Sequence, residues 1–350
     1  MQKNLMKNNG FPMAIDVEGD LLPVTGANID SWYVKAEFES NGKQLGFTWH
    51  QGTIALSSML PKVVGKITNI LPHSGKLISA ECVFMNATDD LWYNYDFTVP
   101  CTKNNGVDHD KMRVYSKWGE LSGNQNKMNL DLVIGNNEIH VTLTANKNEP
   151  VLYNGGTGCI ELGSSLSYEY AFTNMHMEGT FIFNGEKYPI TGGHAWFDRQ
   201  YGMKNQKNKV AKLMPGKSVW MWIGIPRLKN GVGTISLWDI YNKGEKYAYL
   251  TVVHEDGLHV NVDCDITYDE IWISEKTGFS YPRVIRLNVP KEEIKLELVC
   301  LSSGTGQEFV RDMKGLSGCQ CLYRVTGTVQ GVPHTSVVDI EMIGDLCGVE

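Results

Sequence analysis

Hydrophobic and polar residues alternate along much of this chain, and the alternation has a period of two. In residues 138–146, Ile139, Val141 and Leu143 would lie on one face of an extended segment and polar residues on the other. Residues 259–268 alternate in the same way. This pattern is typical of half-buried antiparallel strands. Few segments carry the 3.6-residue period of an amphipathic helix, so the pattern predicts an all-β chain.

Turn signals separate the alternating segments. Asn-Gly and Asp-Gly pairs suit type I′ hairpin turns, because both central residues of these turns need a positive φ. The chain has 36 glycines among its 350 residues, a larger share than the usual ~7%, and hairpin turns account for part of this excess. The pairs, with a weaker Gln-Gly signal included, begin at Asn41, Asn184, Asn230, Asp256 and Gln330.

The two halves of the chain carry similar segments in the same order. Residues 31–50 and 219–241 each contain an aromatic strand, an Asn-Gly turn and a second aromatic strand. Residues 178–198 and 326–342 each read as a hairpin, and in both segments the second and third residues are Gly-Thr. The repeat predicts two similar β-units, and closing each into a barrel would remove exposed sheet edges. We expect an N-terminal extension (1–24), a first barrel (25–203), a linker or mobile loop (204–217) and a second barrel (218–350).

Composition and charge limit the partners of the chain. Hydrophobic residues make up 42% and charged residues 20%, which fits an ordinary globular protein. A net charge of −7 leaves no basic excess for nucleic acid. No apolar run approaches the ~20 residues of a membrane helix, and the N-terminus lacks the apolar region of a secretory signal. We therefore expect a cytoplasmic protein without stable membrane insertion; an oligomer is compatible with the sequence but not indicated by it.

Neither a cofactor nor a metal is predicted. The eight cysteines are scattered, as expected for free thiols in a reducing compartment. Cys319 and Cys321 form a C-x-C pair, but a zinc site would need further ligands nearby. The chain has no Walker loop, no G-x-S-x-G elbow and no H-E-x-x-H motif.

The segment with the most chemical character is residues 191–202, TGGHAWFDRQYG. On a strand, His194, Trp196 and Asp198 would share one face. If this face is enclosed, Asp198 loses hydration and its pKa rises. A carboxyl group with a raised pKa can act as a general acid. The structural alternative is that Asp198 pairs with an arginine such as Arg199 and that His194 is a core histidine.

Other aromatic residues could form a pocket for a flat, unsaturated ligand, or could simply pack a barrel. Four of these residues form two pairs that share a strand face, and the fifth ends a strand next to a tryptophan. These candidates are Trp220 and Trp222, Tyr168 and Tyr170, and His50.

Several segments resemble the carotenoid 1,2-hydratase and AttH-like family, which is related to kievitone hydratases and to lipocalin-like cyclases. The most specific match is AWFDRQYG, residues 195–202, which resembles the family signature AW-x-D-[RH]-[QE]-[WY]. Tyr201 stands where tryptophan is more usual. The supporting segments are residues 31–50, 151–163, 168–202 and 219–231.

The resemblance implies two tandem lipocalin-like antiparallel β-barrel domains, with an aromatic pocket near their junction. It implies that Asp198 protonates an alkene of a hydrophobic substrate, such as a terpenoid or polyphenol. The expected reaction is hydration, dehydration, isomerisation or cyclisation. We expect Trp196, Trp222 and Tyr201 to shape the pocket and His194 to carry a second proton. The alternative is a lipocalin-like carrier without chemistry, which a solvent-exposed Asp198 locked to an arginine would favour.

Overall fold

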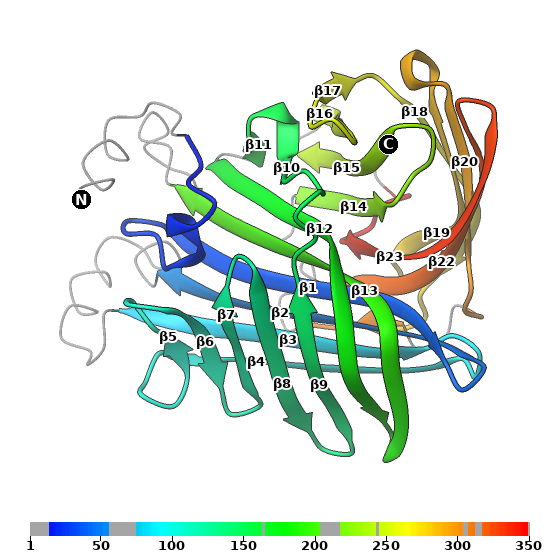
Figure 1. Ribbon diagram of the computed structural model, residues 1–350. Helices are drawn as coiled ribbons and strands as arrows, with labels where there is room; N and C mark the ends of the chain where they lie inside the picture. Colours follow the sequence, from blue (N-terminus) through cyan, green and yellow to red (C-terminus); the bar gives the residue numbers. More distant parts are fainter. Residues whose placement is uncertain are drawn as a thin grey trace.

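The computed structural model describes residues 14–55, 75–162, 165–203, 218–242, 245–303, 307–311 and 317–348. The predicted linker, residues 204–217, lies outside the described residues. The described strands form two antiparallel sheets (Figure 1). The strands of the first sheet lie between residues 29 and 203, and those of the second between residues 218 and 343.

The first sheet has 13 strands in the described part of the chain. Its path runs β4-β3-β2-β1-β13-β12-β9-β8-β7-β6-β5, and β10 and β11 also pair with β12. The strands are β1 (Ile29–Ser40), β2 (Lys43–Ala55), β3 (Lys76–Asn86), β4 (Leu91–Pro100), β5 (Gly106–Val107), β6 (Met112–Ser116), β7 (Gly119–Asn124), β8 (Lys127–Ile134), β9 (Asn137–Thr144), β10 (Leu152–Tyr153), β11 (Cys159–Leu162), β12 (Ser165–Phe183) and β13 (Glu186–Met203).

The second sheet has 10 described strands, in the order β17-β16-β15-β14-β23-β22-β20-β19-β18, with β21 paired to β22. The strands are β14 (Ser218–Pro226), β15 (Val232–Asn242), β16 (Glu245–His254), β17 (His259–Val262), β18 (Asp265–Ile273), β19 (Ser280–Val289), β20 (Ile294–Cys300), β21 (Glu308–Phe309), β22 (Gly318–Val329) and β23 (Val332–Ile343).

The all-β prediction and the two lipocalin-like antiparallel units are confirmed. Each sheet curls like a half-barrel, and the pairing of the described strands leaves both ends of each path open. The described helices are 3-10 turns of three residues: Gly19–Leu21, Asn154–Gly156 and Pro290–Glu292. Among the described residues, no helix has the length and apolar character that crossing a bilayer requires.

The internal repeat is also confirmed, because the two sheets share a topology. In each, the first strand pairs with both the second and the last strand: β1 with β2 and β13, and β14 with β15 and β23. Equivalent glycines stand in the last hairpins. Gly179 and Gly327 have φ of 146° and 151°, and a Cβ there would lie 2.1 and 2.0 Å from a neighbouring carbonyl oxygen. No other residue type fits this combination of backbone angle and close approach.

Replacing Gly327 by alanine should therefore destabilise the protein by about 2–4 kcal/mol, as a strained backbone and a steric clash coincide. Denaturant titration would measure the change in unfolding free energy. Gly202→Ala on β13 is the matched control, because its Cβ would have 3.9 Å to its nearest neighbour, Ile29. Equal effects of the two substitutions would contradict this reading of Gly327.

Each half-barrel encloses its own hydrophobic core. The first includes Trp32, Phe47 and Phe197, and the second includes Ile223 and Ile340. The sheets meet through their other faces, where a third cluster joins residues of both. This inter-sheet cluster contains Leu152, Ile160, Ala171, Trp196, Trp222, Trp238, Ile240 and Val253, with Tyr33, Trp220, Tyr247 and Tyr249 packed against it.

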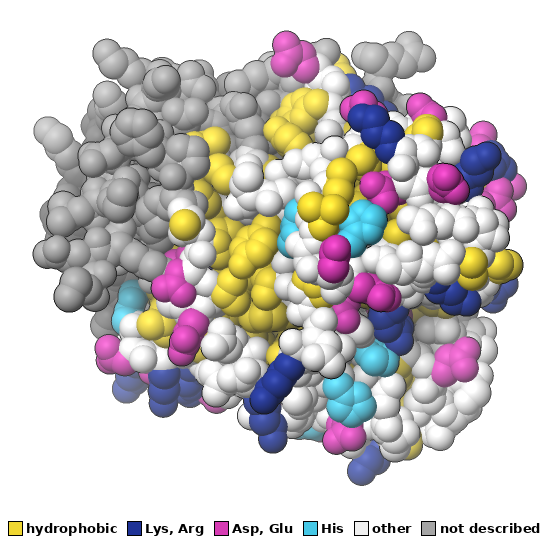
Figure 2. All heavy atoms as spheres, turned by 45° about the horizontal axis from the view of Figure 1, so that its top comes forward, with side chains coloured by type: hydrophobic (Ala, Val, Ile, Leu, Met, Phe, Trp, Pro, Cys, Tyr) yellow, Lys and Arg dark blue, Asp and Glu magenta, His cyan; other side chains and the backbone are white. Residues whose placement is uncertain are grey.

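Figure 2 shows one face of the molecule with charged side chains of both signs interspersed on it. Such mixing provides no continuous basic surface on this face for a phosphate backbone.

Candidate active site between the two sheets

Asp198 belongs to a row of titratable side chains that crosses four strands of the first sheet. The antiparallel register pairs Asp198 with Tyr33, Tyr33 with His50, and His50 with Glu81. Directly paired residues project from the same face of a sheet. Neighbouring strands lie about 4.8 Å apart, so the backbones at Asp198 and His50 are separated by ~10 Å. The row faces the second sheet rather than the core of its own half-barrel.

The second sheet covers this row with aromatic and amide groups. The Trp222 ring makes edge contacts with the rings of Tyr33, at 5.7 Å between centroids, and Trp196, at 5.5 Å. The Gln320 amide donates a hydrogen bond to the Tyr33 hydroxyl at 3.0 Å. Gly224 makes room for the indole of Trp196, since a Cβ there would lie 2.9 Å from that ring. The site is thus built from both sheets.

Asp198 itself is buried, with 6% of its surface exposed. The indole Nε1 of Trp196 donates a hydrogen bond to its Oδ1 at 2.7 Å. Burial raises the pKa of Asp198 to about 7, while the Trp196 hydrogen bond and the charge of Lys35 oppose the rise. A carboxyl group in this state holds its proton near neutral pH and can donate it.

Asp198 is not paired with its neighbour Arg199. The Arg199 side chain projects from the opposite face, where it forms a fully buried ion pair with Asp30 at 2.5 Å. It also stacks over Trp32, at 4.1 Å from the ring centroid. The condition that would have favoured a simple carrier, an exposed Asp198 locked to an arginine, is therefore not met by these residues.

Four further carboxyl groups lie on the faces that the two sheets turn toward each other, and burial raises the pKa of each. For Asp339 and Glu81 the pKa rises to about 7. For Glu169 it rises well above the usual range, with the charge of Asp198 as the next cause, and for Glu341 it also rises. Ionisation of Asp198 is disfavoured by the charge of Glu341, and ionisation of Glu169 by the charges of Asp198 and Glu341.

The buried ammonium group of Lys35 provides a positive charge near these carboxyl groups. Lys35 is fully buried, and its Nζ pairs with Glu37 at 2.9 Å. The same ammonium donates to the carbonyl oxygens of Gly224 at 3.2 Å and Asp339 at 3.1 Å, both on the second sheet. It lies 5.2 Å from the ring centroid of Trp222. Lys35 thus joins the two sheets and brings a positive charge close to the acid.

His50 is the imidazole of the row. Burial, followed by the charge of Arg311, lowers the pKa of His50 to about 4. Its ring lies 5.9 Å from that of Tyr33, in an edge arrangement. Arg311 also forms an ion pair with Glu81. A neutral imidazole can accept a proton from a reacting group.

Of the predicted tryptophans, three take part in this site. Trp196 and Trp222 are in edge contact with each other, and Trp220 donates a hydrogen bond from Nε1 to Glu341 at 3.0 Å. Trp238, which pairs with Trp222 on the neighbouring strand, extends the aromatic wall.

His194 shares the face of Asp198 but lies elsewhere along it. His194 is four residues before Asp198 on β13, so the backbones of the two residues are ~13 Å apart. The His194 ring contacts that of His176 at 6.3 Å. Burial, Arg227 and His176 together lower the pKa of His194 to about 4. The structure does not bring His194 together with Asp198, so the expected second proton carrier is not supported here.

The three predicted pocket tyrosines also lie apart from Asp198. Tyr201 stacks on Tyr168 at 5.2 Å, and its hydroxyl donates to Asp20 Oδ2 at 2.9 Å. The Tyr170 hydroxyl donates to the carbonyl oxygen of Val17 at 2.8 Å. All three project from the other face and pack against the segment that precedes β1. The structure therefore does not bring these three tyrosines together with Asp198.

Tyr201→Phe should therefore lower stability by about 1–2 kcal/mol, because Asp20 loses a buried partner, and should leave turnover nearly unchanged. Chemical denaturation and steady-state kinetics on the same preparation would check both. A large loss of kcat without loss of stability would return Tyr201 to the site.

Sequence reasoning missed Tyr33, Lys35, Glu81, Glu169, Asp339 and Glu341. The sequence contains a signal for some of these residues in two strands, where polar and charged residues alternate with apolar ones. Tyr33, Lys35 and Glu37 alternate with apolar residues, and Asp339 and Glu341 alternate with Val338, Ile340 and Met342. A run of charged residues on one face of a strand marks either solvent or a polar interface, and only the packing of the two sheets distinguishes these.

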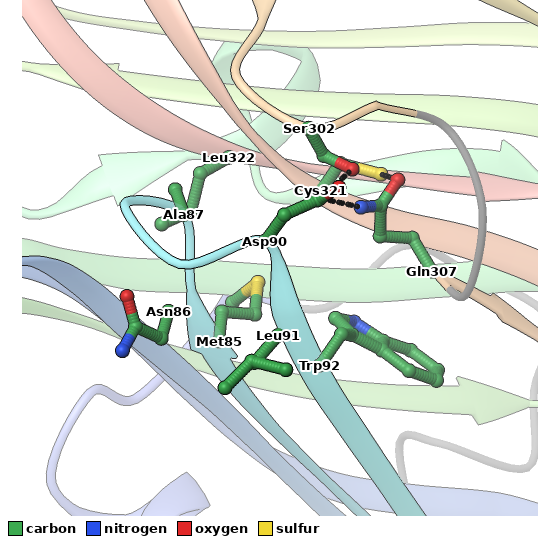
Figure 3. Close-up of a pocket in the computed structure, with 10 residues that line it drawn as sticks. All are labelled: Met85, Asn86, Ala87, Asp90, Leu91, Trp92, Ser302, Gln307, Cys321 and Leu322. Carbon is green, nitrogen blue, oxygen red and sulfur yellow. Dashed lines mark hydrogen bonds between the residues drawn. The ribbon is translucent and has the colours of Figure 1, made fainter.

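A small recess beside the site is lined by residues of both sheets, which contact each other there (Figure 3). Asp90 lies in the turn between β3 and β4 and accepts hydrogen bonds from Ser302 at 2.9 Å and Gln307 at 3.4 Å. Trp92 donates from Nε1 to the Gln320 carbonyl at 3.1 Å. Hydrogen bonds from Ser303 and Ser302 hold the pKa of Asp90 below its usual range despite partial burial. This carboxylate anchors the hairpin and is no proton donor.

The described residues contain no cluster of three or more His, Cys, Asp or Glu side chains able to hold a metal ion. The chemistry of the inter-sheet site is that of proton donors, proton acceptors and aromatic rings.

Two curated proteins resemble part of the chain. Dehydratase asqC of Emericella nidulans is 27% identical over 158 residues, and kievitone hydratase of Fusarium solani subsp. phaseoli is 25% identical over 156 residues. Each match covers 42% of this chain, and 42% and 41% of the respective relative. The chain therefore spans less than half the length of these relatives.

Two solved structures share the fold over almost the whole chain. A protein of Nitrosomonas europaea described as an AttH has a TM-score of 0.76 and 20% identity, covering 96% of this chain and 99% of that one. Kievitone hydratase from Nectria haematococca has a TM-score of 0.71 and 17% identity, covering 95% and 93%. The AttH-like family model matches residues 12–330. The chain thus belongs to the AttH-like family.

Proposed function

We propose that this protein is an enzyme that adds water to, or removes it from, a hydrophobic unsaturated small molecule, with Asp198 as the general acid. The observation that carries the proposal is the buried Asp198 carboxyl, whose pKa is raised to about 7 and whose Oδ1 is fixed by Trp196. The names of the two curated relatives, a dehydratase and a hydratase, support the same reaction class.

In the direction of hydration, Asp198 gives its proton to one carbon of the alkene and becomes a carboxylate. The positive charge that develops on the other carbon lies against the faces of Trp196 and Trp222, which stabilise cations. Water then attacks that carbon, and His50 accepts the proton that the water loses. Dehydration follows the same steps in reverse. Every step moves only protons and water, so residues of this chain supply all of the chemistry.

The arrangement also suggests the form of the substrate. Aromatic side chains from both sheets lie together with carboxyl groups and His50 between the sheets. Such a combination of groups suits a flat, largely apolar molecule with one reactive double bond or alcohol. We therefore propose terpenoid or polyphenol-like substrates; the same acid could also start an isomerisation or a cyclisation.

The test is turnover of a panel of prenylated polyphenols and terpenoid alkenes in ¹⁸O-labelled water. The proposal predicts that at least one compound gains one molecule of water carrying the label. Chromatography with mass detection would also reveal isomers of unchanged mass. Tight binding of panel members without any change in mass or retention would favour a carrier.

A further inference from the structure

A concave surface lies farther along the contact between the two sheets, away from Asp198. It is a groove of about 550 Å³ between the first sheet and the β14–β15 and β22–β23 hairpins of the second. Its volume is within the usual range for small-molecule sites. The residues that give it chemical character are Glu37, Arg227, Lys229, Arg324 and His334.

The groove carries an excess of positive charge. Among the described residues, Arg227, Lys229 and Arg324 form no ion pair. The Glu37 carboxylate in the groove is already paired with Lys35, which leaves Glu39 as the one other acidic side chain in the lining. Arg227, Lys229 and Arg324 are all exposed, so their charges are open to a ligand in the groove. Guanidinium groups bind phosphate and carboxylate groups through paired hydrogen bonds.

The backbone at Arg227 is unusual. Its φ is 57°, in the left-handed region, which is unfavourable for a residue with a side chain. The position of the residue that follows Arg227 is fixed, because Leu228 is buried and its N–H donates to the Gly233 carbonyl at 2.9 Å. A strained non-glycine residue held by its surroundings is a common feature of binding sites.

Two histidines beside Arg227 have unsatisfied nitrogens. His334 lines the groove and is 4% exposed; its Nε2 lies 2.9 Å from the Ser336 hydroxyl, while its Nδ1 is buried without a hydrogen-bond partner. His194 Nδ1 is also buried and unpartnered. When Ser336 donates to Nε2, the Nδ1 of His334 carries a hydrogen with no acceptor. A buried polar group of this kind needs an explanation.

We propose that this groove binds a small molecule bearing phosphate or carboxylate groups, with Arg227 as its main contact and Arg324, Lys229 and His334 around it. The proposal is independent of the reaction assigned to Asp198. The two sites are nonetheless adjacent through Glu37, which lines the groove and also accepts hydrogen bonds from Lys35 at 2.9 Å and from the Asp339 N–H at 2.6 Å. A bound anion would place negative charge next to the buried Lys35–Glu37 pair.

Isothermal titration of the full chain at low ionic strength, with pyrophosphate and separately with citrate, tests the proposal. We expect saturable binding of at least one anion, weakened by added salt. Tighter binding of pyrophosphate would indicate a phosphate ligand, and tighter binding of citrate a carboxylate ligand. Arg227→Gln should weaken binding at least tenfold, and Arg324→Gln should weaken it severalfold.

The matched control is Arg286→Gln, which removes the same charge from β19, where Arg286 pairs with Asp269 and Glu297. It should bind like the wild type. If Arg227→Gln fails to fold, Arg324→Gln decides the outcome. Absence of saturable binding of both anions, or equal loss of affinity in the Arg286 and Arg324 variants, would overturn the proposal.

Discussion

Asp198→Asn is expected to reduce kcat by about 10²- to 10⁴-fold, the usual contribution of a general acid. The asparagine keeps the shape of the side chain and can still accept the hydrogen bond from Trp196 Nε1, but it has no proton to donate. Substrate binding should change little, because the aromatic wall is untouched. Steady-state kinetics on the substrate found in the labelled-water panel would measure kcat and KM separately.

The same variant should be more stable than the wild type above neutral pH. The pKa of Asp198 is raised to about 7 in the folded protein, whereas an unfolded aspartate titrates near ~3.9. Between these values the folded state binds more protons than the unfolded state, so the unfolding free energy of the wild type falls as pH rises through this window. Asp198→Asn removes that loss, which is on the order of a few kcal/mol. Loss of activity with unchanged pH dependence of stability would contradict the assignment.

Lys35→Met is expected to have the second-largest effect, and it acts on both stability and pH dependence. Removing the ammonium leaves Glu37 without its cationic partner, which should cost about 3–5 kcal/mol. The charge of Lys35 also lowers the pKa of Asp198. In its absence the pKa of Asp198 rises further, so activity that needs protonated Asp198 should persist to higher pH.

Two variants separate these effects. Lys43→Met removes a half-buried lysine that pairs with Asp89 at 2.5 Å and lies away from Asp198, and it should change neither stability nor the pH profile appreciably. The double variant Lys35→Met/Glu37→Gln should regain part of the lost stability while keeping the shifted pH profile. A wild-type pH profile in both Lys35 variants would show that Lys35 only joins the sheets.

Much of the fold could be predicted because its signals are local. Alternation with a period of two identifies strands such as β9, and Asn-Gly pairs identify hairpins such as that at Asn41. The repeat was readable because both halves use the same turn residues. The curl of each sheet and its open ends depend on pairing between distant strands, which no local pattern specifies.

The site could be predicted only in part, for a related reason. Alternation placed Trp196 and Asp198 on one face. Applied consistently, it also places Tyr201, three residues from Asp198, on the opposite face, where the structure has it. The tyrosine was expected in the site because the family signature includes that position. Glu341 and Lys35 could not be assigned, since only the packing of one sheet on the other brings them to Asp198.

The most direct test of the account is the protonation state of Asp198 in the folded protein. Carbon-13 NMR of protein labelled at the aspartate carboxyl carbons, with Asp198→Asn used to assign the resonance, would follow its titration. A midpoint near pH 7 is expected, with the carboxyl still largely protonated at pH 6. A midpoint near the ordinary aspartate value of ~3.9 would mean that Asp198 is a carboxylate at neutral pH and cannot be the acid.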